Sequence, residues 1–118
     1  MVITGIGVDI VKVHRFKKDF GVRFLERCFT SYETKYLQSK GSASMAGLFS
    51  AKEAVAKALG TGFNGFWPCD IEVRHDERGK PSIVLHGKAL EAAKGAVIQI
   101  SISHTDEEAI AFAVAVLQ

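Results

Sequence analysis

The first segment of the sequence could place an acid beside a ligand. Residues 2–9 alternate in the way that predicts a β-strand, with Val2, Thr4, Ile6 and Val8 on one face. The other face carries Ile3, Gly5, Gly7 and Asp9. Two glycines beside an acid form a bare surface, which is typical of a place where another group approaches the backbone closely.

Glu53 and Lys57 form the second candidate. They stand four positions apart in an alanine-rich segment, so a helix places them on one face. Taken alone, such a pair is an ordinary surface interaction that contributes about 0.2–0.5 kcal/mol to helix stability. Here it leads into Gly60-Thr61-Gly62, whose backbone N–H groups we expect to be accessible to a phosphate.

The third candidate is Ser101-Ile102-Ser103-His104, where the polar face of an expected strand ends in a histidine. A lone histidine in such a place is also compatible with a hydrogen-bonded turn residue. Two carboxylates from distant segments, Asp9 and Glu53, suit Mg²⁺, which binds few carboxylates and leaves positions for substrate phosphates. With a lysine and a histidine to neutralise phosphate charge, the set favours phosphoryl transfer.

Other common chemistries lack their patterns. No cysteine–histidine or serine–histidine–acid arrangement is evident, and the glycine loop matches neither a P-loop nor a dinucleotide fingerprint. The two cysteines, Cys28 and Cys69, have no zinc-type spacing, so free thiols are expected.

The elements that must position these residues combine strands with helices. Residues 45–59 are the clearest helix, ended by Gly60, with Leu48, Ala51, Val55, Ala58 and Leu59 as its buried stripe. Residues 40–44 are expected to be a polar loop, and a shorter helix is expected from a capping box at Thr30 and Glu33. Val13, Phe16, Phe20 and Phe24 recur at helical spacing up to a break near Gly21.

The second half of the chain predicts two hairpins separated by a helix. Strands around 71–73 and 83–85 flank a turn at 76–81, a helix covers 87–94, and strands at 98–103 and 109–116 flank a turn at 105–108. One face of the last strand is entirely alanine, which implies close approach by a helix or by another subunit. We therefore expect an α+β fold: an antiparallel β-sheet packed against a long central helix.

The composition limits the class of protein to which the chain can belong. The 118 residues, 47% hydrophobic and 24% charged, suit a single globular domain spanning 1–118. The net charge is only +2, but residues 12–27 hold six basic and two acidic side chains. Such a patch is either a solvated helix face or a surface that attracts an acidic partner. No apolar run is long enough to span a bilayer and no secretory signal is evident, so we expect no membrane association and a cytoplasmic location.

Together, in order, these pieces resemble holo-acyl-carrier-protein synthases, small 4'-phosphopantetheinyl transferases. The matching segments are residues 5–11, which include Asp9, then Arg15, then Phe29 and Glu33. They continue with the long block 49–62, Gly79-Lys80-Pro81, and residues 100–105, which include His104. The resemblance implies the 4'-phosphopantetheinyl transferase fold. It implies transfer of 4'-phosphopantetheine from coenzyme A to a serine of apo acyl carrier protein, with release of 3',5'-ADP and a role in fatty acid biosynthesis and lipid metabolism.

The resemblance also implies roles for residues. Asp9 and Glu53 would hold Mg²⁺, and with Lys57 and His104 they would form the catalytic set. The cofactor-binding residues would be Lys57, Gly60, Thr61, Gly62, Lys80, Pro81, Ser103, His104 and Thr105. Arg15 matches the family's partner-binding arginine, and Arg23 and Arg27 would extend that surface. Members of the family are homotrimers with sites at subunit interfaces, and the alanine face suits such packing.

One position departs from the family's pattern. Many members have arginine just before the phenylalanine of the central block, where this chain has Leu48. If that arginine contacts the nucleotide, another cation such as Lys52 or Lys80 must replace it.

Two alternatives compete with this interpretation. A basic module that binds RNA through residues 12–27 would leave Asp9, Glu53 and His104 unexplained, and the chain lacks the interleaved exposed aromatic residues of a single-strand binder. A catalytically inactive relative kept as an assembly partner would have no need of the intact set Asp9, Glu53, Lys57 and His104. We therefore expect no nucleic-acid partner.

Overall fold

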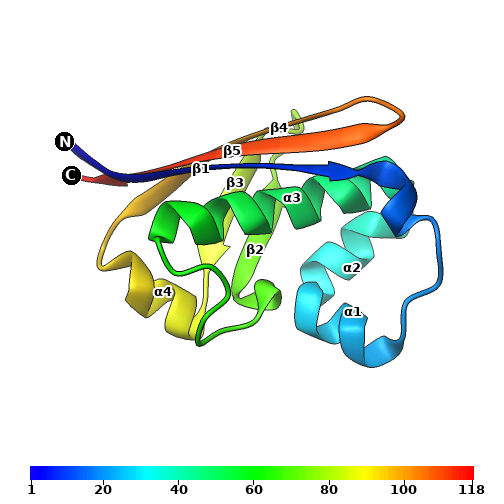
Figure 1. Ribbon diagram of the computed structural model, residues 1–118, viewed down its shortest axis with the longest axis horizontal. Coiled ribbons are helices and arrows are strands. Elements are labelled where there is room, and N and C mark those ends of the chain that lie inside the picture. The colour runs from blue at the N-terminus through cyan, green and yellow to red at the C-terminus, as the bar shows by residue number, and fades with distance from the viewer.

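The computed structural model describes residues 1–118 and has the expected α+β organisation, with two sheets on either side of a central helix (Figure 1). A three-stranded antiparallel sheet has the order β1-β5-β4, and a two-stranded sheet pairs β2 with β3. The single sheet that we expected is therefore divided in two. The strands are β1 Val2–Lys12, β2 Ile71–His75, β3 Pro81–Leu85, β4 Val97–His104 and β5 Glu108–Leu117.

The helices lie between and beside the sheets. They are α1 Val22–Cys28, α2 Ser31–Leu37, α3 Ser42–Leu59 and α4 Gly87–Ala93, with 3₁₀ turns η1 Val13–Phe16 and η2 Pro68–Asp70. The two chain termini lie together at the end of the molecule opposite α1 and α2 (Figure 1).

The central helix α3 is longer than the sequence indicated. It begins at Ser42, so the expected loop at 40–44 is wrong for its last three residues. The carbonyl oxygen of Gly41 accepts hydrogen bonds from the N–H groups of Ser44 and Met45, which starts the helix early. Gly60 ends it in the left-handed conformation (φ +80°), as predicted.

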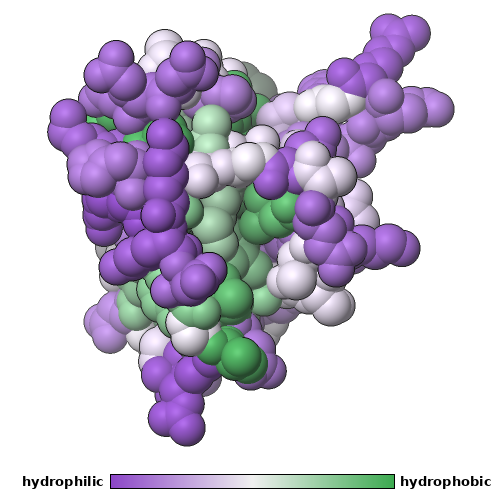
Figure 2. Space-filling view, turned by 90° about the vertical axis from the view of Figure 1, so that its right-hand side faces the viewer, coloured by the Kyte–Doolittle hydropathy of each residue, from purple (hydrophilic) through white to green (hydrophobic).

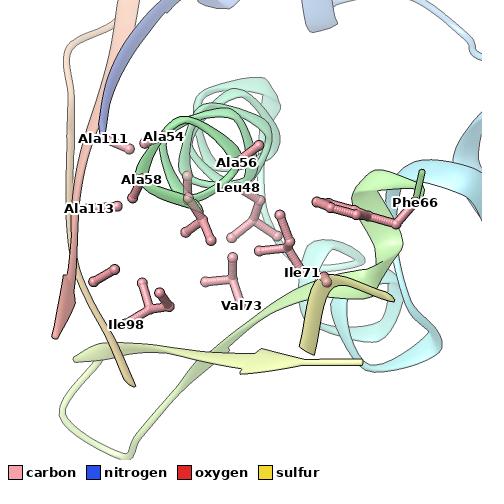
Figure 3. Packing of buried hydrophobic residues seen from close by; sticks show 14 of the residues in the cluster. Leu48, Ala54, Ala56, Ala58, Phe66, Ile71, Val73, Ile98, Ala111 and Ala113 are labelled. Atoms are coloured by element: carbon pink, nitrogen blue, oxygen red, sulfur yellow. The ribbon is translucent and has the colours of Figure 1, made fainter. Parts of the chain in front are cut away.

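The contact between α3 and the three-stranded sheet is made by the smallest side chains. Cβ atoms built on Gly5 and Gly7 would lie far inside van der Waals contact of the carbonyl oxygens of Ala58 and Ala54. From β5, the alanine face points at the same side of the helix, with Ala111 and Ala113 opposite Ala54 and Ala58 (Figure 3). The close approach predicted for both surfaces is thus confirmed, and the helix is what approaches.

The opposite side of α3 packs on the two-stranded sheet through larger residues. Leu48 and Val55 join Ile71 and Val73 in the main hydrophobic cluster, and Leu48, Ile71 and Val73 can be followed in Figure 3. Because α3 is covered on both sides, most of its residues are buried and not only one stripe.

A buried ion pair fastens α3 to α2 and β2. Lys52 and Glu33 are both fully buried, and Lys52 Nζ donates to both carboxylate oxygens of Glu33 at 2.7 and 2.8 Å. Nζ also donates to the carbonyl oxygens of Pro68 and Ile71, and Glu33 accepts the N–H of Val73. The predicted capping box at Thr30 is present, with Glu33 as its acid.

The phenylalanine stretch after β1 is not the continuous helix that its spacing suggested. Val13 and Phe16 lie in η1, residues 17–21 are not helical, and Phe24 lies in α1, which begins after Gly21. The rings still gather, with Phe16 5.4 Å from Phe49 and Phe20 stacked on Phe24 at 4.6 Å between centroids. Ring packing, which does not require helical backbone, explains the spacing.

The outer face of the three-stranded sheet is apolar and exposed. Ile6, Val8 and Ile10 of β1 and Ile110 and Phe112 of β5 are each between 41% and 63% exposed. The alanine face is covered by α3, so of the two partners predicted for it, a helix or another subunit, the helix is the one found. An exposed apolar sheet face of this kind is typical of an interaction surface.

No helix has both the length and the apolar character needed to span a membrane.

The close approach at Gly7 can be tested by adding one methyl group. We expect Gly7→Ala to lower the free energy of unfolding by about 1–3 kcal/mol or more, because the backbones of β1 and α3 must separate. Urea unfolding followed by circular dichroism measures the change. Gly21→Ala is the matched control, since a Cβ there meets nothing within 4 Å. Equal stability of the two variants would contradict the packing described for β1 and α3.

Candidate active site

Asp9 and Lys57 meet where β1 crosses α3. Lys57 Nζ lies 3.4 Å from Asp9 Oδ1 and donates to the carbonyl oxygen of Val8 at 2.9 Å. The buried Ser50 hydroxyl donates to the main-chain oxygen of Asp9 at 2.9 Å, and it lies 3.2 Å from Oδ2. The Asp9 side chain is only 15% exposed, whereas Lys57 is 52% exposed. Asp9 is therefore held from two sides by α3.

Glu53 completes this first cluster. Burial raises the pKa of the Glu53 carboxyl, and the nearby charge of Asp9 raises it further, while Lys57 and Arg15 act in the opposite direction. Lys57 makes its ion pair with Asp9 and not with Glu53, so the pair on α3 is not the simple surface interaction that its spacing allowed. Two carboxylates thus lie close enough for their negative charges to oppose one another.

The acid pair has the chemistry of a magnesium site. Both side chains offer carboxylate oxygens, the ligands that Mg²⁺ prefers, and a cation beside them would relieve their repulsion. No group of three or more His, Cys, Asp or Glu side chains could hold a metal ion entirely by itself. The donor set therefore fits an ion that takes one or two carboxylates and completes its shell with water and phosphate.

The predicted arginines surround the same cluster. Arg15 lines a cavity of about 420 Å³ with Phe24 and Phe49 among its walls. Arg23 and Arg27 line a neighbouring cavity of about 430 Å³, which shares Phe24 and Phe49 and also reaches Glu53. Seen from the right-hand end of Figure 1, hydrophilic side chains stand on both sides of a hydrophobic strip (Figure 2). Arg15, Arg23 and Arg27 thus line two cavities that share Phe24 and Phe49, and the second of these cavities reaches Glu53.

His104 lies in a second cluster, separate from the first. Asp9 of β1 and Ile102 of β4 both pair with Ala111 of β5, so roughly 10 Å separates their strands. His104 lines a cavity of about 160 Å³ on the β4 side, together with Gly79 of the β2–β3 turn and Pro81, the first residue of β3. The structure therefore brings Asp9, Glu53 and Lys57 together and brings His104 to the Gly79-Lys80-Pro81 turn, but it does not join the two groups within one chain.

Two neighbours of His104 do not line its cavity. Ser103 is exposed and pairs with Ile110, so it lies on the outer face of the sheet. The Thr105 hydroxyl accepts the N–H groups of Glu107 and Glu108 and shapes the β4–β5 turn.

The loop after α3 differs from the expectation in one respect. The N–H groups of Gly60, Thr61 and Gly62 were expected to be accessible to a phosphate, but they donate to the carbonyl oxygens of Ala56 and Lys57. These hydrogen bonds close the C-terminal turn of the helix, so the loop has no free run of donors.

Lys52 does not replace the arginine that many family members have where this chain has Leu48. All of its hydrogen bonds go to Glu33, Pro68 and Ile71 in the protein interior, so that suggestion is wrong. Leu48 is 2% exposed and forms part of the wall of the His104 cavity. Lys80 remains exposed at the β2–β3 turn.

Sequence reasoning missed several residues of the two clusters. Ser50, which fixes Asp9, is one turn before Glu53 on α3, and this helical spacing could have identified it. Tyr36, Ser44 and His75 join the His104 cavity from three separate elements. No local signal could have identified these three, because only the tertiary packing of α2, α3 and β2 brings them together.

Comparison with known proteins agrees with the resemblance in the sequence. Residues 5–113 match the model of the 4'-phosphopantetheinyl transferase superfamily. A holo-[acyl-carrier-protein] synthase of Clostridium acetobutylicum is 46% identical, over 95% of this chain and 96% of that protein. One from Thermoanaerobacter sp. is 49% identical, over 94% of this chain and 86% of that protein.

Solved structures agree with the fold. The Bacillus anthracis holo-(acyl-carrier-protein) synthase, in complex with CoA (3',5'-ADP), has a TM-score of 0.83 and 37% identity and covers 98% of both chains. The Helicobacter pylori enzyme, in complex with coenzyme A, has a TM-score of 0.84 and 34% identity, over 94% of this chain and 99% of that chain. With its acid–lysine cluster in the matched region, this chain belongs to the 4'-phosphopantetheinyl transferase superfamily, among the holo-[acyl-carrier-protein] synthases.

Proposed function

We propose that this protein, as one domain spanning 1–118, transfers 4'-phosphopantetheine from coenzyme A to a serine hydroxyl of apo acyl carrier protein, releasing 3',5'-ADP. The observation that carries the proposal is the convergence of Asp9, Glu53 and Lys57 where β1 crosses α3. The similar Bacillus anthracis and Helicobacter pylori enzymes bind coenzyme A or 3',5'-ADP in their solved structures, which supports the same substrate here. A role in fatty acid biosynthesis belongs to the same proposal.

Mg²⁺ is part of the proposal, with Asp9 and Glu53 as its protein ligands. When bound, the ion would polarise the pyrophosphate of coenzyme A and neutralise charge that develops there. Ser50 holds the Asp9 carboxylate in place by its hydrogen bonds. Lys57, held near Asp9 and half-exposed, is placed to contact a phosphate oxygen and to stabilise the leaving group.

The serine hydroxyl needs an acceptor for its proton as its oxygen attacks the β-phosphorus. Glu53 is our candidate, because it is the carboxylate that opens into the aromatic cavity beside the basic rim. His104 and the Gly79-Lys80-Pro81 turn would position the nucleotide end of coenzyme A. The exposed Lys80 is the cation of this chain left to serve where the family often has arginine.

An acidic carrier protein fits the surface beside Glu53. Arg15, Arg23 and Arg27 form a positive rim, and Phe24 and Phe49 offer apolar surface at its centre. Such an arrangement combines electrostatic attraction with a buried apolar contact, so it orients a partner and raises its encounter rate. A serine of the bound partner would then lie next to Glu53.

A homotrimer is the assembly that we propose. The exposed Ile and Phe residues of the outer sheet face need a cover, and a second copy of the chain supplies one. The separation of His104 from Asp9 and Glu53 also favours sites shared between subunits, with the acid pair from one copy and His104 from its neighbour.

The first test is the intact mass of apo acyl carrier protein after incubation with the enzyme, coenzyme A and Mg²⁺. We expect a gain of one phosphopantetheine, its loss on addition of EDTA, and its return with added Mg²⁺. Glu53→Ala should lower the rate at least about 100-fold, because it removes a metal ligand and the proton acceptor. Glu91→Ala, which removes an exposed carboxylate of α4, is the matched control. An unchanged rate in EDTA or in Glu53→Ala would contradict the roles assigned.

The carrier surface is tested by reversing one charge. Arg15→Glu should raise the KM for acyl carrier protein about tenfold or more and leave the affinity for coenzyme A unchanged, because only the acidic partner meets this rim. Initial rates over a range of carrier concentrations give the KM, and calorimetry gives the coenzyme A affinity. Lys88→Glu makes the same charge change on α4 as the control. Equal loss of both affinities would exclude a partner-specific role for Arg15.

Shared sites can be tested by mixing two inactive variants. Glu53→Ala and His104→Ala should each be strongly impaired alone, whereas co-refolded mixtures should recover about a quarter of the wild-type sites, the fraction expected from random pairing at a cyclic interface. Activity of the mixture and its mass by sedimentation are the measurements. A trimer whose mixtures remain as inactive as their parents would show that one chain supplies both residues.

A further inference from the structure

The only tryptophan of the chain lies beside the carrier surface formed by Arg15, Arg23 and Arg27, and the proposed function does not use it. Trp67 directly precedes η2 and is 53% exposed, although its ring is one of the largest apolar groups in proteins. The guanidinium carbon of Arg27 lies 4.4 Å from the centroid of the ring. Because Arg27 belongs to α1, this contact joins two segments that are far apart in the sequence.

The stack fixes the orientation of Arg27. A cation over an aromatic face is attracted by the ring, and tryptophan gives the strongest contact of this kind. None of the ion pairs within the chain includes Arg27. Stacking uses the flat face of a guanidinium, whereas the N–H groups that bind a carboxylate lie at its edge. Arg27 is therefore held in one place while its edge stays available to the carboxylate of a partner.

The backbone that carries Trp67 is held by the protein interior. The N–H of Trp67 donates to Asp70 Oδ2 at 3.1 Å, and Pro68 follows as the first residue of η2. The carbonyl oxygen of Pro68 accepts a hydrogen bond from the buried Lys52 ammonium at 3.2 Å. An exposed aromatic side chain on a fixed backbone loses little freedom on binding, which is typical of the residues that dominate a protein interface.

The neighbours of Trp67 indicate the chemistry of its partner. Arg23 and Arg27 line the same cavity of about 430 Å³, and Glu53 is the only acid on its walls. Positive charge around an exposed aromatic ring fits the surface of an acidic protein. Arg27 covers a face of the ring on which a nucleotide base would stack, so the arrangement favours a protein over a nucleic acid.

We propose that Trp67 is a specificity-determining residue for the acidic carrier protein. The ring holds the Arg27 guanidinium so that its N–H edge pairs with a carboxylate of the carrier. The exposed part of the ring contacts an apolar side chain of the same partner. This inference rests on the proposed function, and it extends the carrier surface from α1 to the segment that precedes η2.

Replacing the ring tests this role in the kinetics. Trp67→Leu keeps an apolar side chain but removes the aromatic face, so it should raise the KM for apo acyl carrier protein about fivefold and leave kcat and the affinity for coenzyme A unchanged. Trp67→Phe, which keeps a weaker aromatic face, should restore most of the KM. Leu90→Ala removes a similarly exposed apolar side chain from α4 and is the matched control.

A second measurement separates binding from transfer, because Trp67 is the only source of tryptophan emission in the protein. An apo carrier protein that has no tryptophan is titrated in the absence of coenzyme A, so no transfer takes place. We expect the emission to move to shorter wavelength as the carrier covers the ring. Combining Arg27→Ala with Trp67→Leu should raise the KM by less than the product of the two single effects, because the two side chains act together.

Three results would overturn the inference. An unchanged KM in Trp67→Leu would exclude the contact, and an equal loss of coenzyme A affinity would show that Trp67 only supports the fold. An emission shift with an RNA oligonucleotide, but none with the carrier, would assign this surface to another class of partner. A carrier protein that shifts the emission of Trp67 but is never modified would refute the proposed function and leave carrier recognition by Trp67 standing.

Discussion

The fold depends on how closely α3 can approach the three-stranded sheet. Glycines on β1 and alanines on β5 and α3 allow backbone to meet backbone, and no larger side chain fits between them. This closeness lets Ser50 reach the main-chain oxygen of Asp9 and lets Lys57 reach the carbonyl oxygen of Val8. The acid pair is therefore set by rigid elements on both sides, which is how a site holds charged groups near one another without rearrangement.

The buried pair of Lys52 and Glu33 fixes the other side of the same helix. A buried ion pair is costly to desolvate, and here four acceptor contacts of Lys52 compensate for that cost. The pair contributes more to the orientation of α3 than to stability, because its directional hydrogen bonds define how the helix is rotated about its axis. Rotation in turn decides that Glu53 opens into the aromatic cavity and not toward the core.

Much of the fold and one half of the site could be predicted from the sequence, for physical reasons. Alternation defined the β1 and β5 faces, and helical spacing placed Glu53 and Lys57 together, because both are local periodicities. The division of the sheet could not be predicted, nor could the choice between a helix and another subunit as the cover of the alanine face, since both depend on which surfaces meet. The backbone N–H groups of residues 60–62 were wrongly expected to be free, because there they form the hydrogen bonds that end the helix. His75 and Tyr36 lie far apart in the chain, and only the packing of α2 on β2 makes them neighbours.

Three consecutive residues of α3 face three different surroundings: Lys52 the buried ion pair, Glu53 the acid cluster and Ala54 the backbone of β1. Each residue of a helix is turned about 100° from the one before it. An insertion of a single residue just before Lys52 would shift all three at once, placing the ammonium in the acid cluster and the carboxylate against β1. The number of residues between Ser50 and Lys57, which both contact Asp9, is therefore fixed by the fold and the site together.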